Sequence, residues 1–256
     1  MILAIDIGNT NIVLGCIEDS EIRFKARLAT DQIKTSDQYT AELNSILTLF
    51  GTAPRSFEGC IISSVVPPVL NSFRTAIRKL TGHEPLVVGP GIRTGLNIQT
   101  DSPNQTGGDL VVAAVAALHE YPLPMAIVDM GTATTISVLN EKGAFIGGCI
   151  CPGVRISQDA LTSRTAQLPG ISLDAPKHVI GRNTIDCMRS GIMYGAAAML
   201  DGLLDRIESE LGQKMHTVAT GGIAKFVIPH CKREMTYDND LLLKGLWLLY
   251  QQNTKD

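Results

Sequence analysis

Two acidic turns, 123 residues apart, carry the side chains best suited to chemistry in this 256-residue chain. The first is Asp6-Ile7-Gly8-Asn9-Thr10-Asn11, and the second is Asp129-Met130-Gly131-Thr132-Ala133-Thr134-Thr135. Each follows a short apolar run. A glycine in such a turn lets backbone N–H groups approach an anion closely, because no Cβ stands in the way. The first carboxylate, Asp6, suits a hydrated Mg²⁺ that neutralises phosphate charge.

The turns also have a simpler interpretation. Asp, Gly and Asn are common turn residues, so the first segment could be an ordinary hairpin turn, and Thr135 could be an ordinary strand residue. The second copy favours two hairpins that grip one polyphosphate from opposite sides. A glycine pair, Gly221-Gly222, follows the expected strand His216–Ala219 and could let a nucleoside lie against the backbone. A plain strand-to-helix turn is the alternative there.

The elements around the two turns repeat as well. Three short apolar runs joined by turns predict an antiparallel meander at the start of the chain, and three more predict another in the middle. These runs are Ile2–Ile5, Ile12–Cys16 and Ile22–Leu28, then Met125–Val128, Thr134–Leu139 and Ala144–Ile150. A duplicated unit of about half the chain predicts two similar α/β domains that face each other, residues 1–118 and 119–256, with the boundary near residues 115–124.

Helical spacing and turn residues place the other elements. Ser36–Phe50 is expected as an amphipathic helix with Ser36 as its N-cap. Asp109, before the apolar segment that starts at Leu110, suits the N-cap of another helix. The remaining expected elements are a strand over Gly59–Val66, a helix over Val69–Leu80, a strand over Pro85–Val88, a helix after Pro152-Gly153, a helix from Thr184 to about Leu211 and a closing helix over Asp240–Gln251.

Composition limits the class of protein. Hydrophobic residues make up 45% of the chain, which is ample for a core, and 25 acidic against 22 basic side chains argue against a sequence-blind nucleic-acid binder. No apolar stretch is long enough for a membrane span, and the N-terminus has no basic region typical of a signal peptide. Six cysteines without a C-x-x-C pair indicate reduced thiols, and Cys149-x-Cys151 has no nearby partners for a zinc site. We therefore expect a soluble cytoplasmic protein that binds neither nucleic acid nor membrane.

The order of these motifs resembles that of a known family. The two acidic turns and Thr220-Gly221-Gly222 are similar to the two phosphate motifs and the adenosine motif of the acetate-and-sugar-kinase/Hsp70/actin superfamily, whose actin-like ATPase fold has two ribonuclease-H-like domains with mixed sheets. Within it, the chain resembles type III pantothenate kinases from Met1 to about Gln251. Supporting stretches are Ser63-Ser64-Val65-Val66-Pro67-Pro68, Val87-Val88-Gly89-Pro90-Gly91, Gly147-Gly148 through Pro152-Gly153, Thr165-Ala166-Gln167-Leu168-Pro169 and Ile180-Gly181-Arg182-Asn183-Thr184.

The resemblance implies ATP-dependent phosphorylation of pantothenate, the first step towards coenzyme A, by a homodimer that uses Mg²⁺ and a monovalent cation (K⁺ or NH₄⁺). It implies that Asp109 is the catalytic base and that Asp129 coordinates the monovalent cation. The ATP contacts that it implies are Asp6, Ile7, Gly8, Asn9, Thr10, Asn11, Ile12, Val13 and Thr132, with Gly221 and Gly222 at the adenosine. The pantothenate contacts are Thr100, Gly107, Gly108, Asp109, Leu110 and Thr184.

Two positions depart from the family pattern. The family's Gly-x-Asp-Arg is Gly108-Asp109-Leu110 here, and an aromatic residue is replaced by Thr100. A hydrogen bond to a charged group contributes about 1.5–3 kcal/mol, so losing the arginine would weaken substrate capture roughly 10- to 150-fold. Arg93, Arg155 and Arg164 are candidate replacements. These departures leave two alternatives open: a nucleotide-binding regulatory protein without catalysis, and a kinase for another small alcohol.

Overall fold

The structure is a computed structural model that describes residues 1–254, and it contains two five-stranded sheets. The first sheet has the strand order β3-β2-β1-β4-β5. Its strands are β1 (Ile2–Ile7), β2 (Asn11–Glu18), β3 (Glu21–Ala29), β4 (Gly59–Ser64) and β5 (Leu86–Val87). Neighbours β1–β2 and β2–β3 are antiparallel, whereas β1–β4 and β4–β5 are parallel. The antiparallel meander predicted at the start of the chain is confirmed.

The second sheet repeats the first. Its order is β10-β9-β6-β7-β8, again with two antiparallel pairs (β6–β7, β7–β8) and two parallel pairs (β6–β9, β9–β10). The strands are β6 (Met125–Met130), β7 (Ala133–Leu139), β8 (Phe145–Pro152), β9 (His216–Thr220) and β10 (Thr236–Tyr237). The duplication predicted from the two acidic turns is therefore a duplication of sheet topology, and the mixed α/β fold is confirmed.

The helices are α1 (Ser36–Leu49), α2 (Pro67–Thr81), α3 (Gly108–Glu120), α4 (Val154–Arg164), α5 (Thr184–Leu211), α6 (Ala224–Val227) and α7 (Leu241–Thr254). Short 3₁₀ turns are η1 (Pro54–Ser56), η2 (Pro103–Gln105) and η3 (Ile228–His230). Within the described residues, no helix has both the length and the apolar character that crossing a bilayer requires.

Two helix starts differ from the sequence-based expectation. The N-cap of α1 is Thr35 and not Ser36, because Thr35 and Gln38 form a reciprocal capping box that satisfies both backbone N–H groups. Helix α3 begins at Gly108, so Asp109 lies in its first turn and is not its N-cap. The corrections move the start of α1 by one residue and that of α3 by two, and both helices stay in place.

Chain contacts divide the molecule into two compact units. Unit 1 contains Met1–Leu96, Ser102–His119 and the C-terminal segment from Asp240, and unit 2 contains Asn97–Asp101 and Glu120–Asn239. Neither unit is a single continuous segment, since α7 belongs with the N-terminal sheet and the short segment Asn97–Asp101 belongs with the second sheet.

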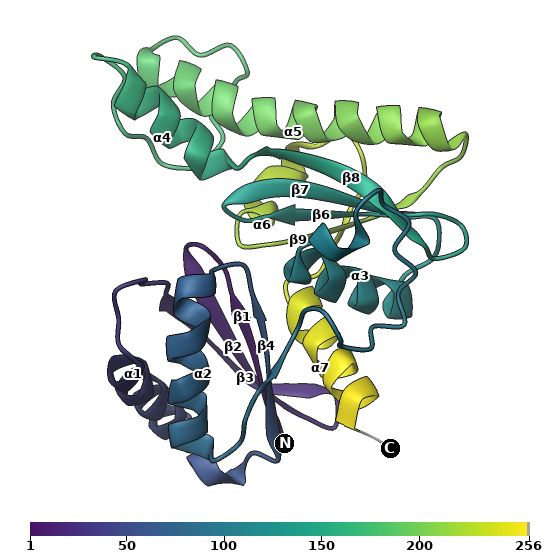
Figure 1. Cartoon of the computed structure of the whole chain (residues 1–256). Coiled ribbons are helices and arrows are strands. Elements are labelled where there is room, and N and C mark those ends of the chain that lie inside the picture. Colours follow the sequence, from purple (N-terminus) through teal and green to yellow (C-terminus); the bar gives the residue numbers. More distant parts are fainter. Residues whose placement is uncertain (255–256) are drawn as a thin grey trace. The chain divides into compact units, whose positions relative to one another are not determined.

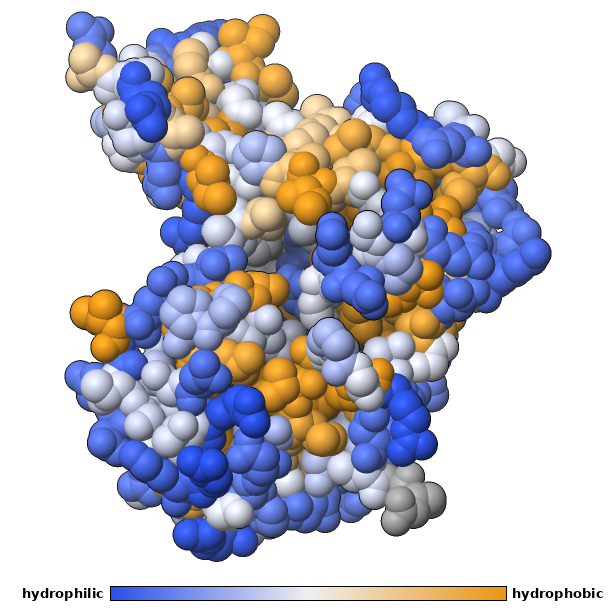
Figure 2. Space-filling model, viewed as in Figure 1, coloured by the Kyte–Doolittle hydropathy of each residue, from blue (hydrophilic) through white to orange (hydrophobic). Residues whose placement is uncertain are grey.

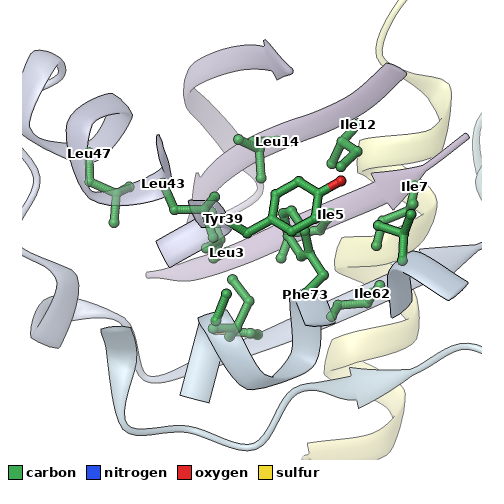
Figure 3. Close-up of a cluster of buried hydrophobic side chains, with 14 of the residues drawn as sticks. Leu3, Ile5, Ile7, Ile12, Leu14, Tyr39, Leu43, Leu47, Ile62 and Phe73 are labelled. Carbon is green, nitrogen blue, oxygen red and sulfur yellow. The ribbon is translucent and has the colours of Figure 1, made fainter. Parts of the chain in front are cut away.

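The core of unit 1 lies between its sheet and the pair α1 and α2 (Figure 1). Figure 3 shows Leu3, Ile5 and Ile7 of β1 directed towards Tyr39 of α1 and Phe73 of α2. Alternate residues of a strand point to opposite faces, so Ala4 and Asp6 lie on the other face. Helix α7 packs on that face of the sheet, where Tyr250 fills the space beside Gly59.

In unit 2 the core forms on one face of the sheet in the same manner. Ala126, Val128 and Met130 of β6 pack against apolar side chains of α5 and α6. Asp129 alternates with these residues and therefore lies on the opposite face of its sheet. Strands β1 and β6 thus each bury an apolar face under helices and have an aspartate on the other face, near the C-terminal end of the strand.

Candidate active site

The first acidic corner is a tight hairpin between β1 and β2. The Gly8 N–H donates to the Asn11 carbonyl oxygen at 3.0 Å, and the Thr30 hydroxyl donates to the Gly8 carbonyl oxygen at 2.6 Å. Asn9, Thr10 and Asn11 are exposed, whereas Asp6 is half-buried at the end of β1. The corner therefore combines a fixed backbone with solvent-facing polar side chains.

Two of the predicted ATP contacts, Ile7 and Ile12, have side chains that are buried in the core. These two residues could contact ATP only through their backbone groups.

Asp109 stands in the same unit, in the first turn of α3. Its Oδ1 accepts from the Leu110 backbone N–H at 2.9 Å. Burial raises the pKa of this carboxyl above its ordinary value, and the backbone N–H donors offset only part of that effect. A Cβ at Gly107 would stand 2.5 Å from this oxygen, so the carboxylate occupies space that glycine leaves open. A carboxylate that is partly desolvated is a better proton acceptor than an exposed one.

The first turn of α3 lies close to the end of β4 and to Val88, which follows β5, in unit 1. A Cβ placed on Gly108 would lie 3.5 Å from Val88 Cγ1 and 3.8 Å from Ser63 Oγ. Ser63 is the register partner of Asp6 in the β1–β4 pair. The structure therefore brings the aspartate corner of β1, the end of β4 and the start of α3 to one edge of this sheet. Ser63 was not among the site residues predicted from the sequence, although it stands in the Ser63–Pro68 stretch that supports the family resemblance.

The second acidic corner, in unit 2, is also a tight hairpin after an aspartate, and its turn is one residue shorter than the first. The Gly131 N–H donates to the Ala133 carbonyl oxygen at 3.0 Å, and Thr132 is exposed at the tip. Asp129 pairs in register with Thr135 on β7 and with Thr220 on β9. The Thr135 hydroxyl is buried and has no hydrogen-bond partner among the described residues. An orphaned hydroxyl beside a carboxylate is an all-oxygen donor set of the kind that hard cations prefer.

Gly221 follows β9 and lies against this corner. It has φ +91°, and a Cβ there would stand 2.6 Å from Asp129 Oδ1 and 2.7 Å from the backbone of Met130. Gly222 is exposed, and the short helix α6 begins two residues further on. The predicted adenosine motif is thus a strand-to-helix turn that also contacts the second acidic corner.

The predicted pantothenate contacts are divided between the two units. Gly107, Gly108, Asp109 and Leu110 belong to unit 1, whereas Thr100 and Thr184 belong to unit 2. Thr100 follows a segment held to β8, where Gln99 N–H donates to the Phe145 carbonyl oxygen at 2.8 Å. Its hydroxyl is buried and lacks a partner within residues 1–254.

Thr184 is the first residue of α5 and is exposed, with Asn183 as the helix N-cap. At the position of the family arginine, Leu110 is half-buried. The three candidate replacement cations, Arg93, Arg155 and Arg164, are exposed, and their side chains form no ion pair within residues 1–254.

The described residues contain no group of three or more His, Cys, Asp or Glu side chains that could hold a metal ion by themselves. Mg²⁺ in phosphate-transferring sites is usually bound by one or two carboxylates together with substrate phosphates, and not by an all-protein cage. The single carboxylate of Asp6, beside the orphaned buried hydroxyl of Ser63, fits that type of site.

Solved structures share this architecture over nearly the whole chain. A conserved Campylobacter jejuni protein, described provisionally as a Baf family transcriptional activator, is 18% identical with a TM-score of 0.62, and 98% of each chain is covered. Component A of (R)-2-hydroxyglutaryl-CoA dehydratase from Acidaminococcus fermentans is 16% identical with a TM-score of 0.56, covering 97% of this chain and 96% of that one. The ROK hexokinase of Thermus thermophilus is 12% identical with a TM-score of 0.52, and 97% of each chain is covered.

At these identities the likeness shows the fold alone, which is the actin-like ATPase fold of the acetate-and-sugar-kinase superfamily expected from the two acidic turns. The sequence itself goes further, because the model of the type III pantothenate kinase family matches residues 2–206. A kinase family uses ATP and a divalent metal ion. With most of its length matched, from the first acidic corner through most of α5, the chain belongs to the type III pantothenate kinase family.

Proposed function

We propose that this protein is an ATP-dependent kinase that converts pantothenate to 4'-phosphopantothenate, the first step of coenzyme A synthesis. The observation that carries the proposal is the repeated corner: each sheet has an aspartate near the end of its first strand, followed by a tight hairpin with exposed polar side chains. Membership of the type III pantothenate kinase family supports the choice of substrate.

In unit 1, residues 6–13 would line the ATP phosphates. The exposed Asn9, Thr10 and Asn11 provide side-chain donors, and backbone N–H groups of the hairpin provide others. Asp6 would hold a hydrated Mg²⁺, which when bound neutralises the charge of the phosphate oxygens. These contacts position the phosphates, and positioning with charge neutralisation is most of what a phosphoryl-transfer site must do.

In unit 2, Thr132 would contact the phosphates and Gly221-Gly222 would lie against the adenosine. Asp129 would coordinate the monovalent cation, K⁺ or NH₄⁺, with the buried Thr135 hydroxyl beside it. Such a cation, when bound, would supply positive charge that favours the phosphates of ATP. The proposed roles of the two units are therefore different, although each corner is a tight hairpin that follows an aspartate.

The transfer itself needs a base for the substrate alcohol. The pantothenate hydroxyl oxygen forms the new bond to the γ-phosphorus, the bond from that phosphorus to the bridging oxygen of ATP breaks, and ADP leaves. Asp109 accepts the hydroxyl proton. Its raised pKa supports this role, because partial desolvation makes the carboxylate a stronger base. Thr100, Gly107, Gly108, Leu110 and Thr184 would contact pantothenate.

A direct assay tests the proposal. Purified protein with ATP, Mg²⁺, K⁺ and pantothenate should form phosphopantothenate, detected by mass spectrometry, and Asp109→Asn should abolish its formation. ATP consumption with another small alcohol but not with pantothenate would reassign the substrate. Nucleotide binding without any product would indicate a regulatory protein.

We propose further that the protein is a homodimer in the cytoplasm. Large apolar side chains are exposed on β8, α4 and the segment before α5, and Figure 2 shows hydrophobic surface in this part of unit 2. The most exposed are Ile150 (77%) and Ile180 (82%). Contiguous apolar surface of this kind is typical of a protein–protein contact. Light scattering after size-exclusion chromatography would measure a mass near 55 kDa for a dimer, about twice the 27.5 kDa of one chain.

A further inference from the structure

Ser63, near the C-terminal end of β4, buries a hydroxyl to which no described residue forms a hydrogen bond. Its side chain is 0% exposed, and Ser63 Oγ has no hydrogen-bond partner among residues 1–254. A buried hydroxyl without a partner is unfavourable, because it has lost its hydrogen bonds to water and gained none in the protein. Native proteins keep few such groups, and each calls for an explanation.

The β1–β4 register decides what Ser63 faces. Ser63 pairs with Asp6, while its neighbour Ile62 and the neighbours of Asp6, Ile5 and Ile7, point into the helix-covered core (Figure 3). Because side chains alternate along a strand, Asp6 and Ser63 share the opposite face, on adjacent strands about 4.8 Å apart. Gly108, in the first turn of α3, lies next to the Ser63 hydroxyl, since a Cβ there would stand 3.8 Å from Ser63 Oγ.

The second sheet repeats this pairing. Asp129 on β6 is the register partner of Thr220 on β9, and Thr220 is 2% exposed. In each sheet, therefore, the aspartate near the end of the first strand has a buried hydroxyl residue beside it on the parallel neighbour. The pairing is part of the sheet topology that the two units share.

A carboxylate that holds a hydrated metal ion uses one oxygen for that purpose, and its orientation is fixed by a hydrogen bond to the other. We infer that Ser63 is a positioning residue for Asp6: its hydroxyl donates to the Asp6 carboxylate oxygen turned away from the divalent cation. This inference deepens the proposed function and rests on it for the role of Asp6. Asp6 has contacts of its own in the structure, and the Ser63 hydroxyl, which has no partner among residues 1–254, would donate to this carboxylate in the metal-bound protein.

The test compares three variants by their affinity for Mn²⁺, measured by electron paramagnetic resonance in the presence of a non-hydrolysable ATP analogue. Ser63→Ala should weaken Mn²⁺ binding about 10- to 100-fold, the usual effect of removing a residue that orients a metal ligand. Affinity for the analogue without metal should not change. The unfolding temperature should stay the same or rise, because the lost hydroxyl had no partner. Ser63→Thr keeps a hydroxyl and should restore Mn²⁺ affinity to within a few fold.

Ser64→Ala is the matched control. Ser64 is the next residue on β4, on the opposite face, and its Oγ accepts from the Val66 N–H at 3.1 Å. This variant should lower the unfolding temperature slightly and leave Mn²⁺ affinity unchanged.

Two results would overturn the inference: unchanged Mn²⁺ affinity in Ser63→Ala, or an equal loss of metal-free nucleotide affinity. Failure of the proposed function is a separate result, since a wild-type protein that binds Mn²⁺ with the nucleotide analogue but does not phosphorylate pantothenate leaves the role of Ser63 intact.

Discussion

The carboxylate of Asp129 occupies the space that a side chain at Gly221 would need, because a Cβ there would stand 2.6 Å from Asp129 Oδ1. Gly221→Ala would also place a Cβ 2.7 Å from the Met130 backbone, at φ +91°. Contacts this short with rigid backbone force the turn to move. We expect a loss of stability of about 2 kcal/mol or more, and a lower affinity for ATP, measured by urea unfolding and by calorimetric titration.

Gly212→Ala separates backbone strain from the clash. Gly212 ends α5 in the same unit with φ +69°, but a Cβ there would meet nothing within 4 Å. The free energy of unfolding of this control should fall by about 1 kcal/mol, and its affinity for ATP should stay the same. Equal effects of the two substitutions would refute a specific role for the contact between Gly221 and Asp129.

Asp109→Asn should trade stability against activity. The pKa of Asp109 is raised in the folded protein, because burial disfavours the charged carboxylate. At low pH Asp109 is protonated in both the folded and the unfolded state, so it does not destabilise the fold. Above the raised pKa it is charged in both states, and the loss of stability reaches its full size. The variant should therefore gain stability relative to the wild type as pH rises from about 3 to 7, while kcat falls at least 100-fold. Urea unfolding at both pH values checks the sign, and a variant that loses stability at pH 7 would contradict it.

The activity of the wild-type protein should depend on the same carboxylate. Because the base must be deprotonated, kcat/KM should fall as pH drops through the raised pKa of Asp109. The acid limb of the pH profile should therefore lie above the range of an ordinary aspartate, whose pKa is about 3.9. An acid limb at that ordinary value would indicate that another group accepts the proton.

Leu110→Arg should improve capture of pantothenate. Leu110 follows the proposed base directly, and leucine offers no charge to the substrate carboxylate. A restored charge-assisted hydrogen bond should raise kcat/KM for pantothenate about 10-fold or more, mainly through KM. Leu110→Met, which changes shape little and adds no charge, should have no such effect. An unchanged KM in the arginine variant would mean that the carboxylate is held elsewhere.

A buried ion pair in unit 2 should determine part of its acid stability. Glu208 is 7% exposed, accepts from Arg233 Nη1 at 2.5 Å and Nη2 at 2.9 Å, and also accepts from the Met215 N–H at 3.1 Å. These donors, Arg233 first, lower its pKa to about 2. The pKa of Glu208 in the folded protein is lower than the ordinary 4.5, so the pair stabilises the protein fully above about pH 4.5. This stabilisation is lost as the pH falls towards 2.

Glu208→Gln should thus lower the free energy of unfolding by about 3 kcal/mol at pH 7 and by little at pH 2, measured by urea unfolding. Asp205→Asn is the comparison, since Asp205 contacts the same guanidinium at 2.7 Å but is 72% exposed. An exposed partner should contribute less than about 1 kcal/mol. Equal losses in the two variants would show that burial of Glu208 is not what makes the pair stabilising.

Local order along the chain was predictable from sequence because its signals are local. The apolar runs before Asp6 and Asp129 and the spacing in α5 predicted strands and a helix that the structure contains. The two acidic turns, by type and spacing, predicted the duplication, and the superfamily followed from the resemblance of these turns and Thr220-Gly221-Gly222 to known motifs. Asp109 was placed by its motif, although the start of α3 at Gly108, two residues before the expected start at Leu110, was missed because glycine carries no strong helix-start signal.

Tertiary structure decided the relations that no spacing encodes. Parallel pairing of β1 with β4 sets Ser63 beside Asp6 across 57 residues, and the pairing of β6 with β9 sets Thr220 beside Asp129 across 91. Packing over the parallel strands buried Asp109 enough to raise its pKa, which its sequence neighbours alone would not do. Burial and register depend on which distant strands pair and which helices cover them. The sequence alone therefore supplied the reacting groups, and the packed sheets determined the neighbours that adjust them.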